Sequence, residues 1–180
     1  MKWKVLSSEY IVRHQYFTAR KDICEMPDHR LVPAYFVVEL PPSVCAMAIT
    51  LEGEVILVKQ YRHPIGEVIT ELPGGFVDKG EDAKTAIARE LMEETGYEFN
   101  QIDALGKVAG NPGVLTGYTH LFLARGGKKI AAQELDANEQ IEILLTPLEV
   151  VRRQLKNNEF VQSLHVSCMM YAFQKLEAVL

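Results

Sequence analysis

Long hydrophobic runs are missing from this sequence. Nowhere do its 180 residues contain about 18 consecutive apolar residues, the length that a membrane-spanning helix needs. The first ten residues, MKWKVLSSEY, also lack the apolar stretch of a secretory signal peptide. We therefore expect a cytoplasmic protein that binds no membrane.

Positive charge is also in short supply. The sequence has 19 Lys and Arg against 24 Asp and Glu, which gives a formal net charge of -5. Nonspecific binding to DNA or RNA depends on basic surface, so we expect no nucleic-acid partner. The excess of negative charge on the protein also repels an anionic substrate, unless a cation and local basic residues offset that charge.

Cysteine is scarce, and its spacing fits no metal site. The three residues, Cys24, Cys45 and Cys168, are odd in number and far apart in the chain. In a cytoplasmic protein this usage predicts reduced, mostly buried thiols without a chemical role.

What the sequence does contain is enough apolar residues for one substantial core. They make up 48% of the chain, which shows no internal repeat, low-complexity tract or obvious linker. Two helices are expected near 147–157 and 160–178, the second carrying Val161, Leu164, Cys168, Tyr171 and Leu176 at helical spacing. Strand-like runs, rich in β-branched and aliphatic residues, cover 10–26, 33–40, 44–50, 54–61, 67–72, 102–110, 119–124 and 139–145.

A further helix is predicted from about residue 81 to 95, and it carries an unusual group of acids. Its apolar arc, formed by Ala83, Ala86, Ile87 and Leu91, should face the core. A solvated acidic face would lie opposite this arc. Instead, Glu90 and Glu94 project into the arc, Glu93 lies at its edge, and the 90/94 pair repels at i,i+4 spacing.

Buried carboxylates need protons, basic partners or a bound cation. Arg89 can offset one charge, but we expect it to project away from its neighbour Glu90, which leaves a deficit of positive charge. Ligands that are all oxygen favour a hard cation, and a site with few carboxylates suits Mg²⁺, which shares its remaining positions with water and substrate phosphates. Metal binding is therefore favoured over a structural network of acids and bases.

The spacing of the whole stretch resembles the Nudix box. Gly75 is followed after five residues by Glu81 and after seven more by the run Arg89-Glu90-Leu91-Met92-Glu93-Glu94-Thr95-Gly96. Every fixed position is filled; the last position, usually aliphatic, is Tyr97. The resemblance implies a Nudix α/β/α sandwich with a mixed sheet at 41–180 and a small N-terminal β region at 1–40.

The resemblance also implies roles for the residues of the box. Glu90, Glu93 and Glu94 would be ligands of Mg²⁺ or Mn²⁺, with the backbone carbonyl of Gly74 as another. Arg89 and Glu81 would form a supporting pair that orients the acids, although an ordinary surface pair is the alternative. The reaction would be attack of water on one phosphorus of a nucleoside diphosphate derivative.

Features outside the box are similar to the ADP-ribose pyrophosphatase branch of the family. They are the run QYR ending at Arg62, the run ELPGG beginning at Glu71, and Pro112, which lies 15 residues after Tyr97. These three residues are the candidates for substrate binding. ADP-ribose is the first choice, to be cleaved to AMP and ribose 5-phosphate. ADP-glucose, GDP-mannose, NADH and dinucleoside polyphosphates remain alternatives, as does a nucleotide-sensing domain without catalysis.

The general base is sought in the acidic run LDANEQ at 135–140. In related enzymes a glutamate of this loop is implicated, and Glu139 is the candidate, as base or as a further metal ligand. The position two residues before it, acidic in some relatives, is Ala137. Glu93 and Asp136 are therefore kept as fallbacks.

The N-terminal β region is expected to build a dimer. A lone hairpin is marginal in water unless it packs against another surface. In the enzymes that this chain resembles, such a region packs across a two-fold axis, and aromatic residues near the boundary stack on adenine. We therefore expect a homodimer whose residues 1–40 contribute to the partner's pocket. The alternative for most of the five aromatics, Tyr10, Tyr16, Phe17, Tyr35 and Phe36, is that they fill the hairpin's own core.

Overall fold

The computed structural model describes residues 1–178 and divides into two compact units. The first contains Met1–Pro42 together with Ala109–Tyr118. The second contains Ser43–Val108 and the chain from Thr119 onwards. No helix in the described part of the chain is both long enough and apolar enough to cross a membrane.

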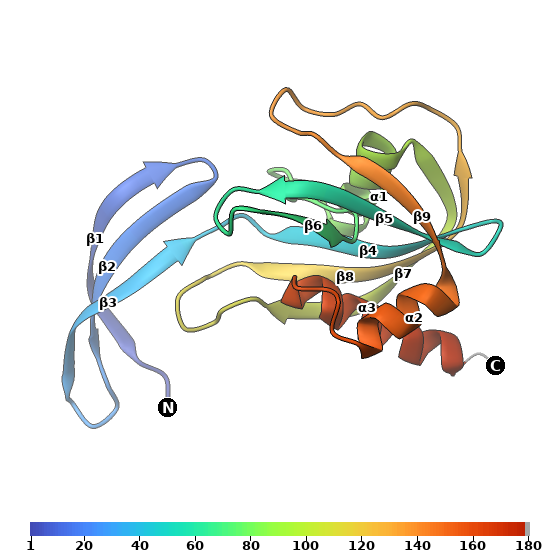
Figure 1. The fold of residues 1–180 in the computed structure, drawn as a ribbon. Helices are drawn as coiled ribbons and strands as arrows, with labels where there is room; N and C mark the ends of the chain where they lie inside the picture. The colour runs from blue at the N-terminus through green and yellow to red at the C-terminus, as the bar shows by residue number, and fades with distance from the viewer. Residues whose placement is uncertain (179–180) are drawn as a thin grey trace. The chain divides into compact units, whose positions relative to one another are not determined.

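The first unit is an antiparallel sheet in the order β1-β2-β3 (Figure 1). The strand-like run expected at 10–26 is in fact a hairpin, because the chain reverses between His14 and Phe17. Val38 of the third strand also bonds to the segment 109–118, donating its N–H to Val114 O at 2.8 Å. The three strands are β1 (Lys4–His14), β2 (Phe17–Glu25) and β3 (Leu31–Glu39).

The second unit contains a six-stranded mixed sheet. Its order is β6-β5-β4-β8-β7, and β9 also pairs with β5. Strand β4 runs parallel to β8 and antiparallel to β5, and β5 runs antiparallel to β6 and β9. The strands are β4 (Ser43–Thr50), β5 (Glu54–Arg62), β6 (Glu67–Glu71), β7 (Tyr97–Ala109), β8 (Tyr118–Lys129) and β9 (Glu142–Pro147).

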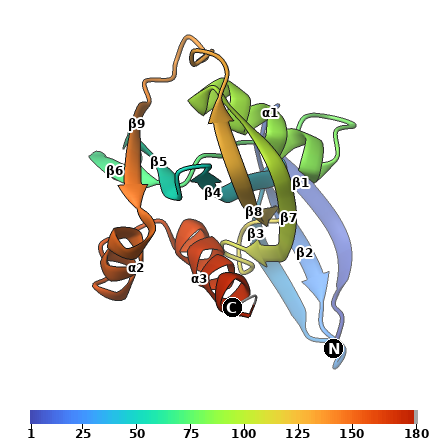
Figure 2. The ribbon, with the colours of Figure 1, turned by 90° about the vertical axis from the view of Figure 1, so that its right-hand side faces the viewer.

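Helices cover both faces of this sheet (Figure 2): α1 (Ala83–Thr95) on one face, α2 (Leu148–Lys156) and α3 (Ser163–Glu177) on the other. The alternation of side chains along β4 explains the two layers. Val44, Ala46 and Ala48 pack with α1, whereas Cys45, Met47 and Ile49 pack with α2 and α3. The predicted α/β/α sandwich with a mixed sheet is confirmed.

Helix α1 begins two residues after the predicted start and ends at the predicted residue. Asp82 is its N-cap, and its carboxylate accepts the N–H groups of Lys84 and Thr85. Gly96 ends it in the left-handed conformation with φ 73° and donates its N–H to Met92 O. The expected apolar arc faces the core, since Ala86, Ile87 and Leu91 are all fully buried.

The buried face of α3 differs from the predicted one. Val161 lies before the helix and is 61% exposed, and Tyr171 is 48% exposed. Of the five residues expected on one stripe, Cys168 alone is buried. The helix buries a neighbouring stripe that begins at His165 and continues with Cys168, Met169, Ala172 and Phe173. The prediction was wrong because Val161 lies outside the helix and the buried stripe is displaced by one residue from Leu164 and Tyr171 to His165 and Ala172. As expected, all three cysteines are free and buried.

Candidate active site

The acids of α1 lie at a meeting point of three segments of the second unit. The other two segments are strand β4 and the turn after β6. Glu94 is 3% exposed, and its Oε2 accepts the backbone N–H of Gly74 at 2.8 Å. The turn is joined to β4 on both sides of Gly74, because Ala46 N–H donates to Pro73 O and Val44 N–H to Gly75 O. The backbone beside Glu94 is therefore held by hydrogen bonds to two different elements.

Both glycines of this turn are required by close approach. Gly74 has φ +152°, and a Cβ there would lie 2.2 Å from Val44 O. A Cβ on Gly75 would lie 2.4 to 2.6 Å from the carboxylate atoms of Glu90. The missing side chains let a strand backbone and a carboxylate approach the turn, as a ligand-binding loop needs.

Arg89 links the acids of the cluster. Its Nε and Nη2 hold both oxygens of Glu81 at 3.1 and 3.0 Å, and its Nη1 lies 3.0 Å from Glu90 Oε1 and 2.9 Å from Glu93 Oε2. The expectation that Arg89 projects away from Glu90 was wrong, because the long side chain reaches Glu90 as well as Glu81 and Glu93. The pair with Glu81 is present, and Arg89 Nη2 also donates to Phe76 O.

The positive charge is nevertheless too small for the acids. Burial raises the pKa of Glu94 to about 8, and the neighbouring charges of Glu90 and Glu139 add to the effect. Burial raises the pKa of Glu90 to about 7 despite the opposing pull of Arg89. Two such carboxyls, Glu94 buried and Glu90 half-buried, that hold their protons near neutral pH mark a place where a cation would be strongly favoured.

The donor set fits a divalent cation. Its candidate ligands are carboxylates and one backbone carbonyl, all hard oxygen donors. Within residues 1–178, no three Asp, Glu, His or Cys side chains are already grouped as a metal site. The three glutamates of the cluster instead have other partners: Glu90 and Glu93 accept hydrogen bonds from Arg89, and Glu94 accepts one from the Gly74 N–H. A bound ion would compete with these partners.

The acidic loop is fastened to the end of α1. Glu134 N–H donates to Glu93 O at 2.8 Å, and the Gln133 amide donates to Glu94 O at 2.6 Å and to Ile141 O at 3.3 Å. Glu139 lies in the turn between these anchors, where its Oε2 accepts the N–H of Asp136 at 3.1 Å. Gln133 was missed by sequence reasoning, because its partners lie far along the chain.

Arg62 and Glu71 form an ion pair across the antiparallel strands β5 and β6, where Glu71 is paired with Val58 and Arg62 with Glu67. Arg62 Nε lies 2.7 Å from Glu71 Oε2, and the Glu71 side chain is 1% exposed whereas that of Arg62 is 41% exposed. Glu71 therefore orients Arg62, which has the exposed guanidinium. His165, also missed by sequence reasoning, lies beside this pair.

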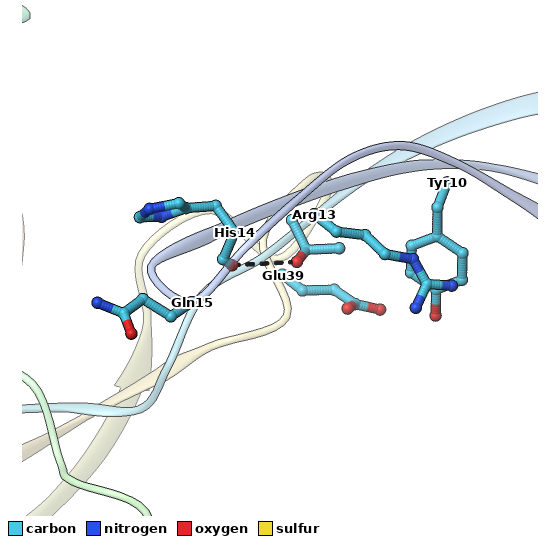
Figure 3. A pocket seen from close by; sticks show the side chains of 6 residues that line it. Tyr10, Arg13, His14, Gln15 and Glu39 are labelled. Atoms are coloured by element: carbon cyan, nitrogen blue, oxygen red, sulfur yellow. Dashed lines mark hydrogen bonds between the residues drawn. The ribbon is translucent and has the colours of Figure 1, made fainter.

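Pro112 belongs to the first unit, where it lies in a turn closed by Leu115 N–H donating to Asn111 O at 2.8 Å. The same unit has an open hollow of about 400 Å³ near the tip of its first hairpin (Figure 3). Arg13 lies over the ring of Tyr10 there, 3.7 Å from its centroid. The lining is largely polar and comes from Tyr10, Arg13, His14, Gln15, Thr18 and Glu39.

Comparisons with known proteins find family models that match both parts of the chain. The NUDIX domain family model matches residues 39–164, and the model of the nucleoside diphosphate sugar hydrolase N-terminal domain matches residues 3–38. The chain is 32% identical to the methanol dehydrogenase activator of Bacillus methanolicus, over 93% of this chain and 91% of the relative.

Two ADP-ribose pyrophosphatases are similar over most of their length. The Bacillus subtilis protein is 31% identical over 87% of both chains, and the Mycobacterium tuberculosis protein 29% identical over 92% of this chain and 80% of the relative. A crystal structure of an ADP compounds hydrolase superposes with a TM-score of 0.85 at 21% identity, covering 99% of this chain and 96% of that one. This last likeness establishes the fold.

Proposed function

The chain belongs to the Nudix family, and we propose that this Nudix pyrophosphohydrolase cleaves ADP-ribose to AMP and ribose 5-phosphate. The observation that carries the proposal is the cluster of glutamates, with Glu94 buried, against the Gly74–Gly75 backbone, in a chain that matches ADP-ribose pyrophosphatases over most of its length. Nudix hydrolases generally use divalent metal ions. We propose Mg²⁺ or Mn²⁺ for this one.

Glu90, Glu93, Glu94 and the carbonyl of Gly74 would hold the ion. When bound, it would neutralise diphosphate oxygens and lower the pKa of a coordinated water. Arg89 would keep Glu90 and Glu93 in place while leaving the cluster short of positive charge, which supports binding of the ion. Its bidentate contact with Glu81 fixes the guanidinium itself.

Arg62 would bind the diphosphate. Its guanidinium is partly exposed, and the buried carboxylate of Glu71 fixes its direction. Glu71 would thus act on the substrate through Arg62. Pro112 would shape the turn in which it lies itself. A guanidinium offsets part of the negative field that a chain with a net charge of -5 presents to an anion.

Glu139 would be the general base, or a group that positions the attacking water. Its charge contributes to the raised pKa values of both Glu90 and Glu94, which supports a place near the cluster. The anchors at Glu134 and Gln133 connect its loop to the helix end that carries Glu93 and Glu94. Glu93 and Asp136 are the alternatives if Glu139 is dispensable.

We further propose a homodimer formed through the N-terminal sheet. Along β1, every residue is exposed, and the first unit exposes Trp3, Val5, Leu6, Tyr10, Ile11, Val12, Tyr16, Phe17, Leu31 and Phe36, each by 38% or more. So much exposed apolar surface on one small sheet is typical of an interaction surface. A second copy of the chain would cover it and bring its aromatic residues to the adenine pocket.

The test is hydrolysis by the purified protein across a panel of ADP-ribose, ADP-glucose, GDP-mannose, NADH and a dinucleoside polyphosphate. Each is assayed with Mg²⁺, with Mn²⁺ and with EDTA, and the products are separated by anion exchange. We expect ADP-ribose to have the highest kcat/KM, with AMP and ribose 5-phosphate as products and no turnover in EDTA. A higher kcat/KM for another compound would refute the substrate, and binding without turnover of any compound would indicate a sensor.

A further inference from the structure

The amide of Leu72 poses a particular problem for the fold. Leu72 is 1% exposed and follows the last residue of β6, so its N–H lies beyond the β5–β6 pairing, which ends at Val58 and Glu71. A buried backbone N–H needs an acceptor. The acceptor is Nδ1 of His165, 3.2 Å away and 93 residues further along the chain, on α3.

We propose that His165 is a positioning residue of the active site: by accepting the Leu72 N–H, its Nδ1 holds the turn that presents the Gly74 carbonyl to the metal ion. This inference rests on the proposed function for its metal. It concerns a residue outside the Nudix box, on an element that supplies no candidate ligand.

The bond determines the protonation state of the imidazole. A backbone amide can only donate, so Nδ1 carries a lone pair and the ring proton is on Nε2. Glu71 Oε1 lies 3.9 Å from the same Nδ1, a contact between two acceptors and not an ion pair. Burial, with a smaller contribution from the charge of Arg62, lowers the pKa of His165 to about 3, in agreement with a neutral ring.

The position of the bond explains why it would matter for metal binding. Arg62 holds the side chain of Glu71, β4 holds the carbonyls of Pro73 and Gly75, and Glu94 holds the N–H of Gly74. Between these anchors, the bond from α3 fixes the Leu72 amide. Loss of this bond would free the backbone two residues before the proposed carbonyl ligand. Groups that orient metal ligands typically affect metal affinity by about 10- to 100-fold.

Two substitutions separate the hydrogen bond from the space that the ring fills. His165→Asn keeps an acceptor, because Asn Oδ1 stands as many bonds from Cβ as His Nδ1 does. His165→Leu fills the space and removes the acceptor. Phe173→Leu is the matched control, since it trims a buried ring two turns further along α3, within the core cluster on that face.

The first measurement is made on the metal-free protein by ¹⁵N NMR. We expect the Nε2–H tautomer of His165 and slow hydrogen exchange of the Leu72 amide in the wild type. Exchange should stay slow in His165→Asn and Phe173→Leu and accelerate at least about tenfold in His165→Leu, which leaves the buried amide without its acceptor. A proton on Nδ1, or a Leu72 amide that stays protected in His165→Leu, would overturn the proposal.

The second measurement is the Mg²⁺ concentration that gives half-maximal hydrolysis of ADP-ribose. It should rise at least about tenfold in His165→Leu, stay near the wild-type value in His165→Asn, and stay unchanged in Phe173→Leu even at an equal loss of Tm. Equal impairment of the Leu and Asn variants, or an unchanged Mg²⁺ requirement in the Leu variant, would contradict it. If the wild type needs no Mg²⁺, the proposed function fails, whereas the NMR experiment still decides whether His165 holds Leu72.

Discussion

The two units of the chain bury their residues very differently. The second packs two apolar layers in which Met47, Ile56, Leu91 and Leu121 are fully buried. In the first, made of three strands and one loop, Asp22 and Cys24 are the only buried residues. Burial of apolar surface is the main favourable term in folding, so the second unit has its own source of stability and the first has little.

This contrast indicates which interactions hold each unit in its conformation. In the second unit, a packed core fixes the elements that carry the glutamates, and the site is built from hydrogen bonds between those elements. The first unit holds its strands together through the β-ladder and ion pairs of Arg20 with Asp22 and Glu39. Catalysis is therefore expected to depend on the second unit, and assembly and base recognition on the first.

The largest effect is expected from Glu94→Gln in the packed unit. The change removes a buried charge while nearly preserving shape, and we expect kcat to fall at least about 100-fold, as for loss of one strong electrostatic stabiliser. Stability should be kept, and at a pH where both carboxyls would be ionised it should be increased, because the repulsion with Glu90 is relieved. Steady-state kinetics and thermal unfolding measure both.

Glu98→Gln is the matched control for that variant, since it removes the same charge from an exposed position on β7. It should leave kcat unchanged. Near-normal turnover in Glu94→Gln would refute the assignment of the metal site.

A smaller effect is expected from Glu139→Gln in the acidic loop. We expect kcat to fall by up to about a hundredfold, the low end of what a general base contributes, with a much smaller rise in KM. The reason is that Glu139 would act mainly in the transition state. An unchanged kcat would transfer the role to Glu93 or Asp136, and single-turnover kinetics would show that the chemical step itself is affected.

Deletion of residues 1–40 tests the comparison between the units most directly. We expect the shortened chain to be monomeric by light scattering, and its KM for ADP-ribose to rise by about tenfold or more, as for loss of one aromatic stacking contact with the base. Ile11→Lys, which places a charge on the 57% exposed side chain of β1, should also break the dimer while keeping the sheet. A full-length monomer with full activity on ADP-ribose would defeat the dimer proposal and leave the metal site untouched.

Much of the fold and the acids of the site could be predicted from local patterns. The helix itself, its buried apolar arc and the position of Glu90 and Glu94 beside that arc follow from one helical stretch and its periodicity. The hairpin within 10–26 was not predicted, because the turn at Gln15 and Tyr16 contains no glycine, proline, asparagine or aspartate.

Other features were hidden because they depend on tertiary contacts. The bonds of His165 with Leu72 and of Gln133 with Glu94 join residues 93 and 39 positions apart, and no local pattern indicates them. Arg89 was misjudged because helical geometry fixes the direction of Cβ but not the path of a long side chain, which reaches both Glu90 and Glu93. The assigned roles of the site residues remain predictions for the experiments above.

The smallest expected effect is a pH dependence of stability that only the packed unit should show. Burial raises the pKa values of Glu90 and Glu94 from an ordinary 4.5 to about 7 and about 8 in the folded, metal-free protein. Their contribution to stability is complete below about pH 4.5 and is lost as the pH rises through 7 and 8, where the fold must hold both charges.

The free energy of unfolding in EDTA should therefore fall between about pH 5 and 8.5, because the folded protein must then hold both charges. Mg²⁺ offsets those charges, so the rise in Tm that it produces should be larger at pH 8.5 than at pH 5.5. Glu94→Gln should flatten the pH dependence, whereas Glu98→Gln should preserve it. Urea unfolding measures the free energy of unfolding across this pH range, and thermal unfolding with and without Mg²⁺ at pH 5.5 and 8.5 measures the rise in Tm. An equal Mg²⁺ effect at both pH values would show that Glu90 and Glu94 are not where the ion binds.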